Sequence, residues 1–219
     1  MRRGFLHRFV RPSARTMKKY IHGTWIAALA AIAIPSHAQE SALPKDVARQ
    51  IPAGYAVMTS KSSDFNGDGK VDYVVVVSNK NEATLLAHGS PAPKRPLLVF
   101  IQGEGGRFSL ESRNDEIVFA ADAGGQCDPF MDDAEGLAAK GSFFTVQNAV
   151  ACGEHWTDFI TFRYSTELRH FVFHKRVFES MIFNSSGEPG ADALIPGKRS
   201  VTNANKLKPI LLGSYVPNK

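Results

Sequence analysis

The stretch Asp64-Phe65-Asn66-Gly67-Asp68-Gly69-Lys70-Val71-Asp72 leads directly into Tyr73-Val74-Val75-Val76-Val77, and together they decide what fold this chain can adopt. Side-chain oxygens recur at the first, third, fifth and ninth positions, as Asp64, Asn66, Asp68 and Asp72. Glycines stand at the fourth and sixth positions, where a loop around a cation needs a tight turn. Because Ca²⁺ takes roughly six to eight oxygen ligands, the spacing predicts a calcium loop. The alternative is a solvated Asn-Gly/Asp-Gly turn.

The residues after the loop exclude an EF-hand. An EF-hand requires a bidentate Glu at the twelfth position and a helix on each side of the loop. The twelfth position here is Val75, and residues 73–77 are rich in β-branched side chains without a helical period. The loop is therefore expected to lead into a buried strand.

The pattern D-x-N-x-D-G-x-x-D followed by an apolar strand resembles the calcium loop of FG-GAP and VCBS repeats. The resemblance implies that Asp64, Asn66, Asp68 and Asp72 supply side-chain oxygens to a structural Ca²⁺, and that Lys70 supplies its backbone carbonyl. Such repeats build propellers of several blades, whereas this sequence contains one such loop, so a propeller is not expected.

A second resemblance extends over most of the chain. The calcium-type loop is followed by Arg95-Pro96-Leu97-Leu98, Arg113-Asn114-Asp115, Gly124-Gly125 and Asp128-Pro129-Phe130. This order is similar to that of small secreted bacterial proteins described as FG-GAP-like. The resemblance implies a secreted, β-rich protein with a calcium loop and no established activity.

Residues 1–38 have the composition of an export signal. They carry seven Arg or Lys and no Asp or Glu, followed by an apolar run over 25–34 and small residues, Ser36 and Ala38, before the expected cleavage point. The run is shorter than the about twenty residues of a spanning helix. We therefore predict a signal peptide or leader over 1–38, a periplasmic or secreted protein of Gram-negative type, and no membrane span after leader removal.

The basic charge of the chain belongs to this leader. The whole sequence has 26 basic and 21 acidic residues; without the seven basic residues of 1–38 it has 19 basic and 21 acidic, a net charge of −2. A nucleic-acid-binding domain is expected to carry a basic face. The net charge of the chain without its leader therefore argues against a nucleic-acid partner.

The two cysteines, Cys127 and Cys152, are expected to pair. An even pair in an exported chain is typical of a disulfide, and the spacing lacks the C-x-x-C pattern of many metal and redox sites. The chain-entropy model credits a loop of this length with roughly 3–4 kcal/mol.

The remaining pattern predicts a mainly β fold, an antiparallel sheet meander of sandwich or propeller-blade type with one short N-terminal helix over 41–52. We expect a β-rich domain over 39–183 and a C-terminal loop over 184–219 with a final edge strand at 207–212. A polar loop is expected over 79–95. Strands are expected over 55–60, 73–77, 96–101, 107–111, 117–121, 136–139, 142–147, 159–164 and 168–177.

Two groups of residues could carry chemistry. The first is a second acidic site at Asp122, Asp128, Asp132 and Asp133, with Asp115 nearby, which fits a cation site, a catalytic carboxylate pair or a solvated turn. The second is His155 beside Trp156, which fits a general base next to a sugar-stacking ring. No G-x-S-x-G or H-E-x-x-H motif is present, and no catalytic residue is assigned. His170 and His174 are too far apart on one strand to share a metal.

Two functions remain open. The first is an exported, non-enzymatic domain with a calcium-pinned β-sheet that binds another protein or an envelope glycan. The second is a periplasmic hydrolase of glycan type that uses carboxylates over 115–133 and His155. Convergence of Asp115, Asp128 and His155 in one concave pocket would distinguish the second function from the first.

Overall fold

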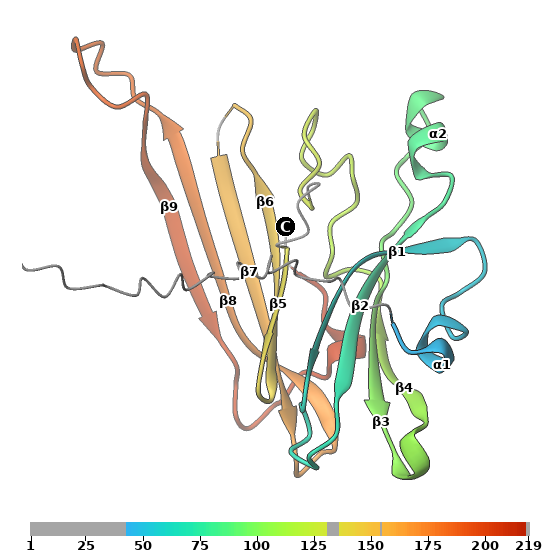
Figure 1. Cartoon of the computed structure of the whole chain (residues 1–219). Helices are drawn as coiled ribbons and strands as arrows, with labels where there is room; N and C mark the ends of the chain where they lie inside the picture. Colours follow the sequence, from blue (N-terminus) through green and yellow to red (C-terminus); the bar gives the residue numbers. More distant parts are fainter. Residues whose placement is uncertain (1–42, 131–135, 154, 218–219) are drawn as a thin grey trace, which may run out of the picture. The chain divides into compact units, whose positions relative to one another are not determined.

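Two antiparallel sheets make up the part of the chain described by the computed structural model, residues 43–130, 136–153 and 155–217 (Figure 1). In both sheets each strand pairs with its neighbours in sequence, which confirms the predicted mainly β, antiparallel meander. The first sheet contains β1 (Tyr55–Ser63), β2 (Asp72–Asn79), β3 (Leu97–Gln102) and β4 (Phe108–Asn114). The second sheet contains β5 (Leu137–Lys140), β6 (Phe143–Val150), β7 (His155–Ser165), β8 (His170–Phe183) and β9 (Leu194–Asn203).

The valine run of β2 is continuous because this strand is covered on both faces. Val74 and Val76 point to one side and belong to the largest buried cluster, whereas Val75 and Val77 belong to a smaller cluster with Val47 of α1 (Lys45–Ala48). Successive side chains of a strand point to opposite faces. The four valines are therefore all buried, and none of them alternates with a polar residue.

The largest cluster joins the two sheets. It takes apolar side chains from β2 and β3 of the first sheet and from β6, β7 and β8 of the second. Its aromatic centre consists of four rings in edge-to-face, stacked or tilted contact, with centroids 5.2 to 6.1 Å apart, within the range of favourable aromatic pairs: Phe65, Phe144, Phe162 and Phe171. These four phenylalanines therefore form the centre of the contact between the sheets.

The helices are short. α1 is a four-residue turn within the predicted helix over 41–52, part of which lies outside the described residues. α2 (Glu82–Ala87) lies within 79–95, where a loop was predicted, so that prediction was wrong there. Two 3₁₀ turns, η1 (Glu104–Gly106) and η2 (Leu212–Ser214), complete the elements. No helix in the described ranges has the length and hydrophobicity to cross a membrane, and the predicted leader lies outside those ranges.

The strand predicted over 117–121 is absent. Side chains, and not a neighbouring strand, provide the hydrogen-bond partners of the backbone there. The buried amide of Asn148 accepts a hydrogen bond from Phe119 N at 2.9 Å and donates one to the Ile117 carbonyl at 2.9 Å. Asn114 accepts bonds from Glu116 N and Ile117 N at 2.7 and 3.1 Å. The segment follows an irregular path with Ile117 and Val118 buried.

The C-terminal predictions were also wrong in detail. A loop was expected over 184–205, yet β9 pairs with β8 there and forms the edge of the second sheet. Over 207–212 an edge strand was expected, and the chain instead makes a single bridge between Leu211 and Val172 before η2. Backbone pairing with β8 outweighs the weak strand preference of Pro196 and Gly197.

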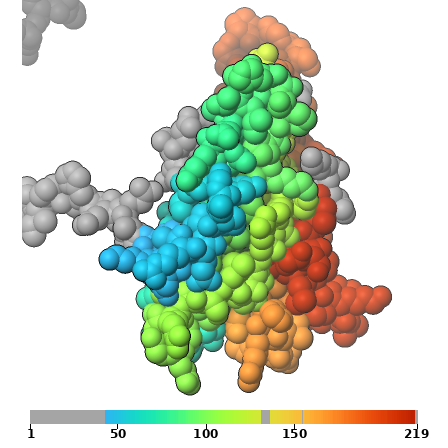
Figure 2. Space-filling view, turned by 90° about the vertical axis from the view of Figure 1, so that its right-hand side faces the viewer, coloured from blue at the N-terminus to red at the C-terminus, as the bar shows by residue number. Residues whose placement is uncertain are grey.

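Asn114 also holds the C-terminal segment. Its Nδ2 donates to the carbonyls of Leu212 and Tyr215 at 2.6 and 2.8 Å, and the residue is 4% exposed. Figure 2 shows the red C-terminal segment beside the yellow-green chain that contains β4. One amide therefore joins the end of β4, the irregular segment and the C-terminus.

Asn114→Ala should lower the free energy of unfolding by about 2–4 kcal/mol, because it leaves several buried backbone groups without a partner. Asn81→Ala is the matched control, since Asn81 is exposed and its side chain makes no hydrogen bond within the described part of the chain. Urea unfolding of both variants measures the difference. Equal midpoints would show that Asn114 does not have this role.

Candidate functional site

The predicted calcium loop connects the two strands of the β1–β2 hairpin. β1 ends at Ser63 and β2 begins at Asp72. Phe65 turns away from the polar side chains and is 1% exposed, with its ring 5.3 Å from that of Phe171 and 6.1 Å from that of Phe144. The loop is therefore anchored in the contact between the two sheets.

The conformation of the loop depends on its glycines and on Asp64. Gly67 and Gly69 have φ values of 77° and 81°, a region that favours glycine. One carboxylate oxygen of Asp64 accepts hydrogen bonds from Gly67 N and Asp68 N at 2.8 and 3.1 Å, and the other accepts one from Gly69 N at 2.9 Å. The chain therefore wraps around the Asp64 carboxylate.

Asn66 and Asp68 each accept one backbone hydrogen bond from the residue two positions further along the loop. The side-chain oxygen of Asn66 accepts from Asp68 N at 3.0 Å, and Asp68 Oδ1 accepts from Lys70 N at 2.9 Å. The Lys70 ammonium lies 3.2 Å from the second Asp68 oxygen. The backbone N–H of Lys70 lowers the pKa of Asp68, although burial opposes this effect.

Asp72 is the buried member of the loop. It is 0% exposed; its Oδ2 accepts a hydrogen bond from Phe65 N at 3.0 Å, and its Oδ1 accepts one from Gln102 N at 2.9 Å. Burial raises the pKa of Asp72, and the N–H groups of Gln102 and Phe65 offset only part of that rise. Asp72 therefore joins the loop to the end of β3 at an electrostatic cost.

Negative potential from this region extends to the second sheet. Burial raises the pKa of Tyr164 on β7, and the carboxylates of Glu111, Asp72 and Asp68 raise it further, whereas Arg169 opposes them. The side chain of Glu111 is 10% exposed, its Oε1 lies 2.8 Å from His170 Nδ1, and its buried Oε2 has no hydrogen-bond partner in the described structure.

The donors of the loop are all oxygens, which suits a hard cation such as Ca²⁺. Each carboxylate oxygen has two lone pairs, so an oxygen that accepts one backbone N–H can still bind a cation. In the described ranges, no group of three or more His, Cys, Asp or Glu side chains is arranged as a metal site. The calcium loop therefore stays a prediction that agrees with the chemistry of the donors.

Asp122 and Asp128 of the predicted second acidic site lie in different surroundings in the fold. Asp132 and Asp133 lie outside the described residues. Asp122 accepts a hydrogen bond from Ala92 N at 3.0 Å and, with Asp115 and Glu116, lines a cavity of about 200 Å³. Asp128 does not line this cavity.

Asp128 instead forms part of a buried ion cluster that the sequence reasoning missed. Arg95, which is 1% exposed, makes two hydrogen bonds to Asp128 at 2.6 and 2.5 Å and two to Glu82 of α2 at 3.0 and 2.6 Å. Burial alone would lower the pKa of Arg95, but the hydrogen bonds of the two carboxylates raise it. The sequence shows the Arg95-Pro96-Leu97-Leu98 motif, but the two carboxylates that bind Arg95 lie 13 and 33 residues away in the chain, so no local pattern indicates them.

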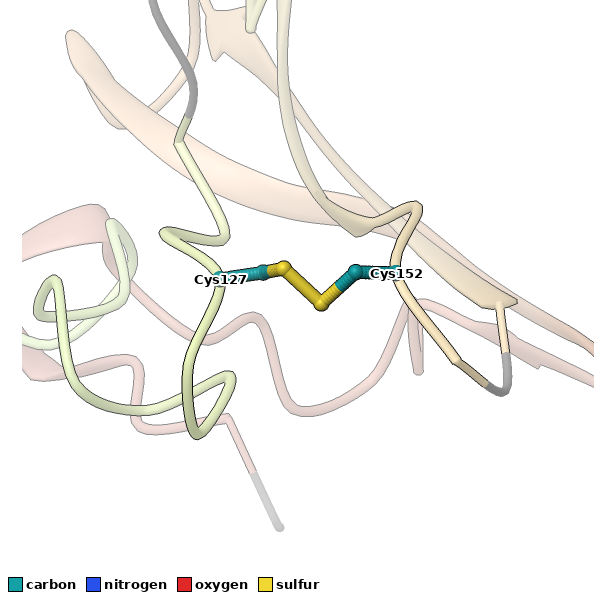
Figure 3. Close-up of a disulfide and its surroundings, with 2 residues drawn as sticks. All are labelled: Cys127 and Cys152. Atoms are coloured by element: carbon teal, nitrogen blue, oxygen red, sulfur yellow. A yellow bond between two sulfur atoms is a disulfide. The ribbon is translucent and has the colours of Figure 1, made fainter.

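Cys127 and Cys152 form the predicted disulfide, with their Cα atoms 6.4 Å apart (Figure 3). The bond joins the turn that contains Asp128 to the connection between β6 and β7. Arg95 therefore fixes one side of the turn and the disulfide fixes the other.

The histidines are not brought together. His155 begins β7 and does not line the cavity with Asp115. Trp156 packs against Phe119 and Phe178, with ring centroids 6.0 and 6.2 Å away. His170 contacts Glu111, and His174 contacts the ring of Phe143 at a centroid distance of 5.1 Å.

Comparison with known proteins shows little similarity. No family model matches the chain, and no curated protein matches it. A solved structure titled "Structure of a Xanthomonas Type IV Secretion System related protein" is similar over 70% of this chain, with 16% identity and a TM-score of 0.36. The match covers 57% of that protein's chain. A TM-score this low supports no conclusion about fold or function.

We expect the pH dependence of stability to report the buried carboxyl of Asp72. Because its pKa is raised on folding, its contribution to stability is present below about pH 4 and declines as pH rises through the folded pKa. In chelator, wild type should therefore lose stability relative to Asp72→Asn as pH rises above about 4. A gain in the stability of wild type relative to Asp72→Asn over the same rise in pH would mean that the hydrogen bonds outweigh burial.

Replacement of both cysteines by serine should lower the free energy of unfolding by about 3–4 kcal/mol, as the chain-entropy model gives for this loop. Guanidinium unfolding of the variant and of oxidised and reduced wild type measures the change. Reduced wild type should behave like the double variant. An unchanged midpoint in the variant would show that the disulfide does not stabilise the fold.

Proposed function

We propose that this chain is an exported β-domain whose loop over 64–72 binds one Ca²⁺ ion, and that its role is non-enzymatic binding of a protein or an envelope glycan. The observation that carries the calcium proposal is the loop itself: a hairpin connection with two glycines at positive φ, wrapped around Asp64 and closed by the buried Asp72. We take the loop to be of the FG-GAP type.

The cation would be held by Asp64, Asn66, Asp68 and Asp72 and by the Lys70 carbonyl. When bound, Ca²⁺ supplies positive charge to a region where three loop carboxylates and the buried Glu111 accumulate negative charge. Burial is the largest cause of the raised pKa values of Asp72 and Tyr164, but nearby carboxylates raise both further, and this accumulated negative charge supports the proposal. The ion would stabilise the hairpin and, through Phe65, the contact between the sheets.

Export is supported by the disulfide, because such bonds persist in oxidising compartments. The leader composition of residues 1–38 adds to this support. We further propose that the two sheets form an open sandwich rather than one blade of a propeller, because they share a single aromatic core.

The contacts of the acidic residues favour binding over hydrolysis. Asp128 is engaged by Arg95 and by Phe130 N, and Asp115 is paired with Arg113 at 2.7 and 2.9 Å. A hydrolase of glycan type would need two carboxyls placed on either side of a sugar bond. The cavity that Asp115 lines includes neither Asp128 nor His155.

The calcium proposal is tested by calorimetric unfolding of the chain in excess Ca²⁺ and in chelator, beside Asp68→Ala. A ligand that binds only the folded state stabilises it by about 2.7 kcal/mol at a hundredfold excess over Kd. We expect wild type to melt at a higher temperature in Ca²⁺, and Asp68→Ala to lose most of this shift.

Asp192→Ala is the control, because Asp192 is an exposed carboxylate outside the loop. It should keep the full shift. Equal melting of wild type in calcium and in chelator would contradict the calcium proposal, and the loop would then be an Asn-Gly/Asp-Gly turn held by its own hydrogen bonds.

A further inference from the structure

A hollow of about 610 Å³ lies where β7, β8 and the segment after β9 meet, and we call it the β7–β8 hollow. Its charged and polar lining comes from Arg163 and Glu167, from His174, and from Asn203, Asn205 and Lys206. Its volume falls within the roughly 300–1,000 Å³ of typical small-molecule sites. No residue of the calcium loop lines it, so its role is independent of the calcium proposal.

The wall of the hollow is fixed at both ends. Ala204 N donates to the His174 carbonyl at 2.9 Å, and Phe173 N donates to the Ile210 carbonyl at 2.8 Å. Between these points residues 205–209 leave the sheet and return to it. Asn205 holds the turn, because its side-chain oxygen accepts from Leu207 N at 2.9 Å. The hollow is therefore formed by hydrogen-bonded backbone before a ligand arrives.

The two cations of the hollow have no partner among the described residues. Arg163 and Lys206 make no side-chain hydrogen bond or ion pair there, and Glu167 is the one carboxylate in the lining. Burial lowers the pKa of His174, and the charges of Arg163 and Lys175 lower it further. With a neutral imidazole the lining has a formal charge of +1.

This charge selects the kind of anion that fits. A phosphate group carries about −1.5 to −2 at pH 7. This negative charge is larger in magnitude than the +1 of the lining, and Glu167 would repel a phosphate more strongly than a singly charged anion. A carboxylate carries −1, and the planar guanidinium of Arg163 matches its two oxygens. The hollow is larger than one carboxylate, and the amides of Asn203 and Asn205 suit hydroxyl groups on the rest of a ligand.

We propose that the β7–β8 hollow binds a monocarboxylate that carries hydroxyl groups, that is, an acidic sugar. Arg163 of β7 and Lys206 of the segment after β9 hold the carboxylate, and the amides bind hydroxyl groups. The bound anion stabilises the imidazolium of His174, so ligand binding is coupled to proton uptake and strengthens below neutral pH. The other charged groups facing His174 are Arg163, Lys175, Lys206 and Glu167, and side chains of these types do not ordinarily titrate from about pH 6 to 8.

The test is a calorimetric titration of the folded chain with glucuronate, glucose and inorganic phosphate. We expect binding of glucuronate and none of glucose at the same concentration, with phosphate weaker than glucuronate. Arg163→Gln and Lys206→Gln should each weaken glucuronate at least tenfold. Lys198→Gln, an exposed lysine of β9 outside the lining, should leave the affinity unchanged.

A second readout follows the His174 ring by NMR. Its pKa should rise when glucuronate is added, and at the same subsaturating glucuronate concentration the rise should be smaller in Arg163→Gln. The proposal is overturned if glucuronate does not bind, if glucose binds equally well, if phosphate binds more tightly, or if both Arg163→Gln and Lys206→Gln keep wild-type affinity. Because the titration is performed in calcium and again in chelator, failure of the calcium proposal is recognised separately.

Discussion

The hydrogen bonds of the Asp72 carboxylate are the interaction on which the rest of the structure depends. One oxygen binds Phe65 N in the loop, and the other binds Gln102 N at the end of β3. The first bond fixes the residue whose ring enters the aromatic contact between the sheets. A single buried carboxylate thereby links a surface loop, the first sheet and the shared core.

Burial of charge is compensated in two different ways in this chain. At Arg95 the compensation is internal, since Glu82 and Asp128 surround the guanidinium with carboxylates and connect α2 to the turn beside the disulfide. At Asp72 it comes from the backbone N–H groups of Gln102, Phe65 and Asn66, and these leave the pKa of the buried carboxyl raised. A buried charge that is incompletely compensated lowers stability. The proposed Ca²⁺ would therefore act at the incompletely compensated Asp72, and not at the Arg95 cluster.

The sequence was most informative where one strong local preference acted alone. The valine run after Asp72 and the alternation in β7 and β8 predicted strands correctly, because burial on one or both faces dictates those patterns. The glycines at 67 and 69 predicted a tight turn, which their positive φ values confirm. Prediction failed where side chains replaced a strand partner, as the nearby Asn114 and the distant Asn148 do for residues 117–119. It failed also at β9, where pairing with β8 overrides local composition, and at Arg95, whose partners no local pattern reveals.

The most direct measurement of the role of Asp72 is amide hydrogen exchange at Phe65 and Gln102, the two donors to its carboxylate. If this carboxylate joins the loop to the sheet, both amides should exchange only when the whole domain unfolds, at rates similar to that of buried Val75 in β2. Asp72→Ala should then accelerate exchange at both positions more than at Val75. Exchange at Phe65 and Gln102 in wild type as fast as at the surface turn residue Gly105 would contradict the central role of Asp72.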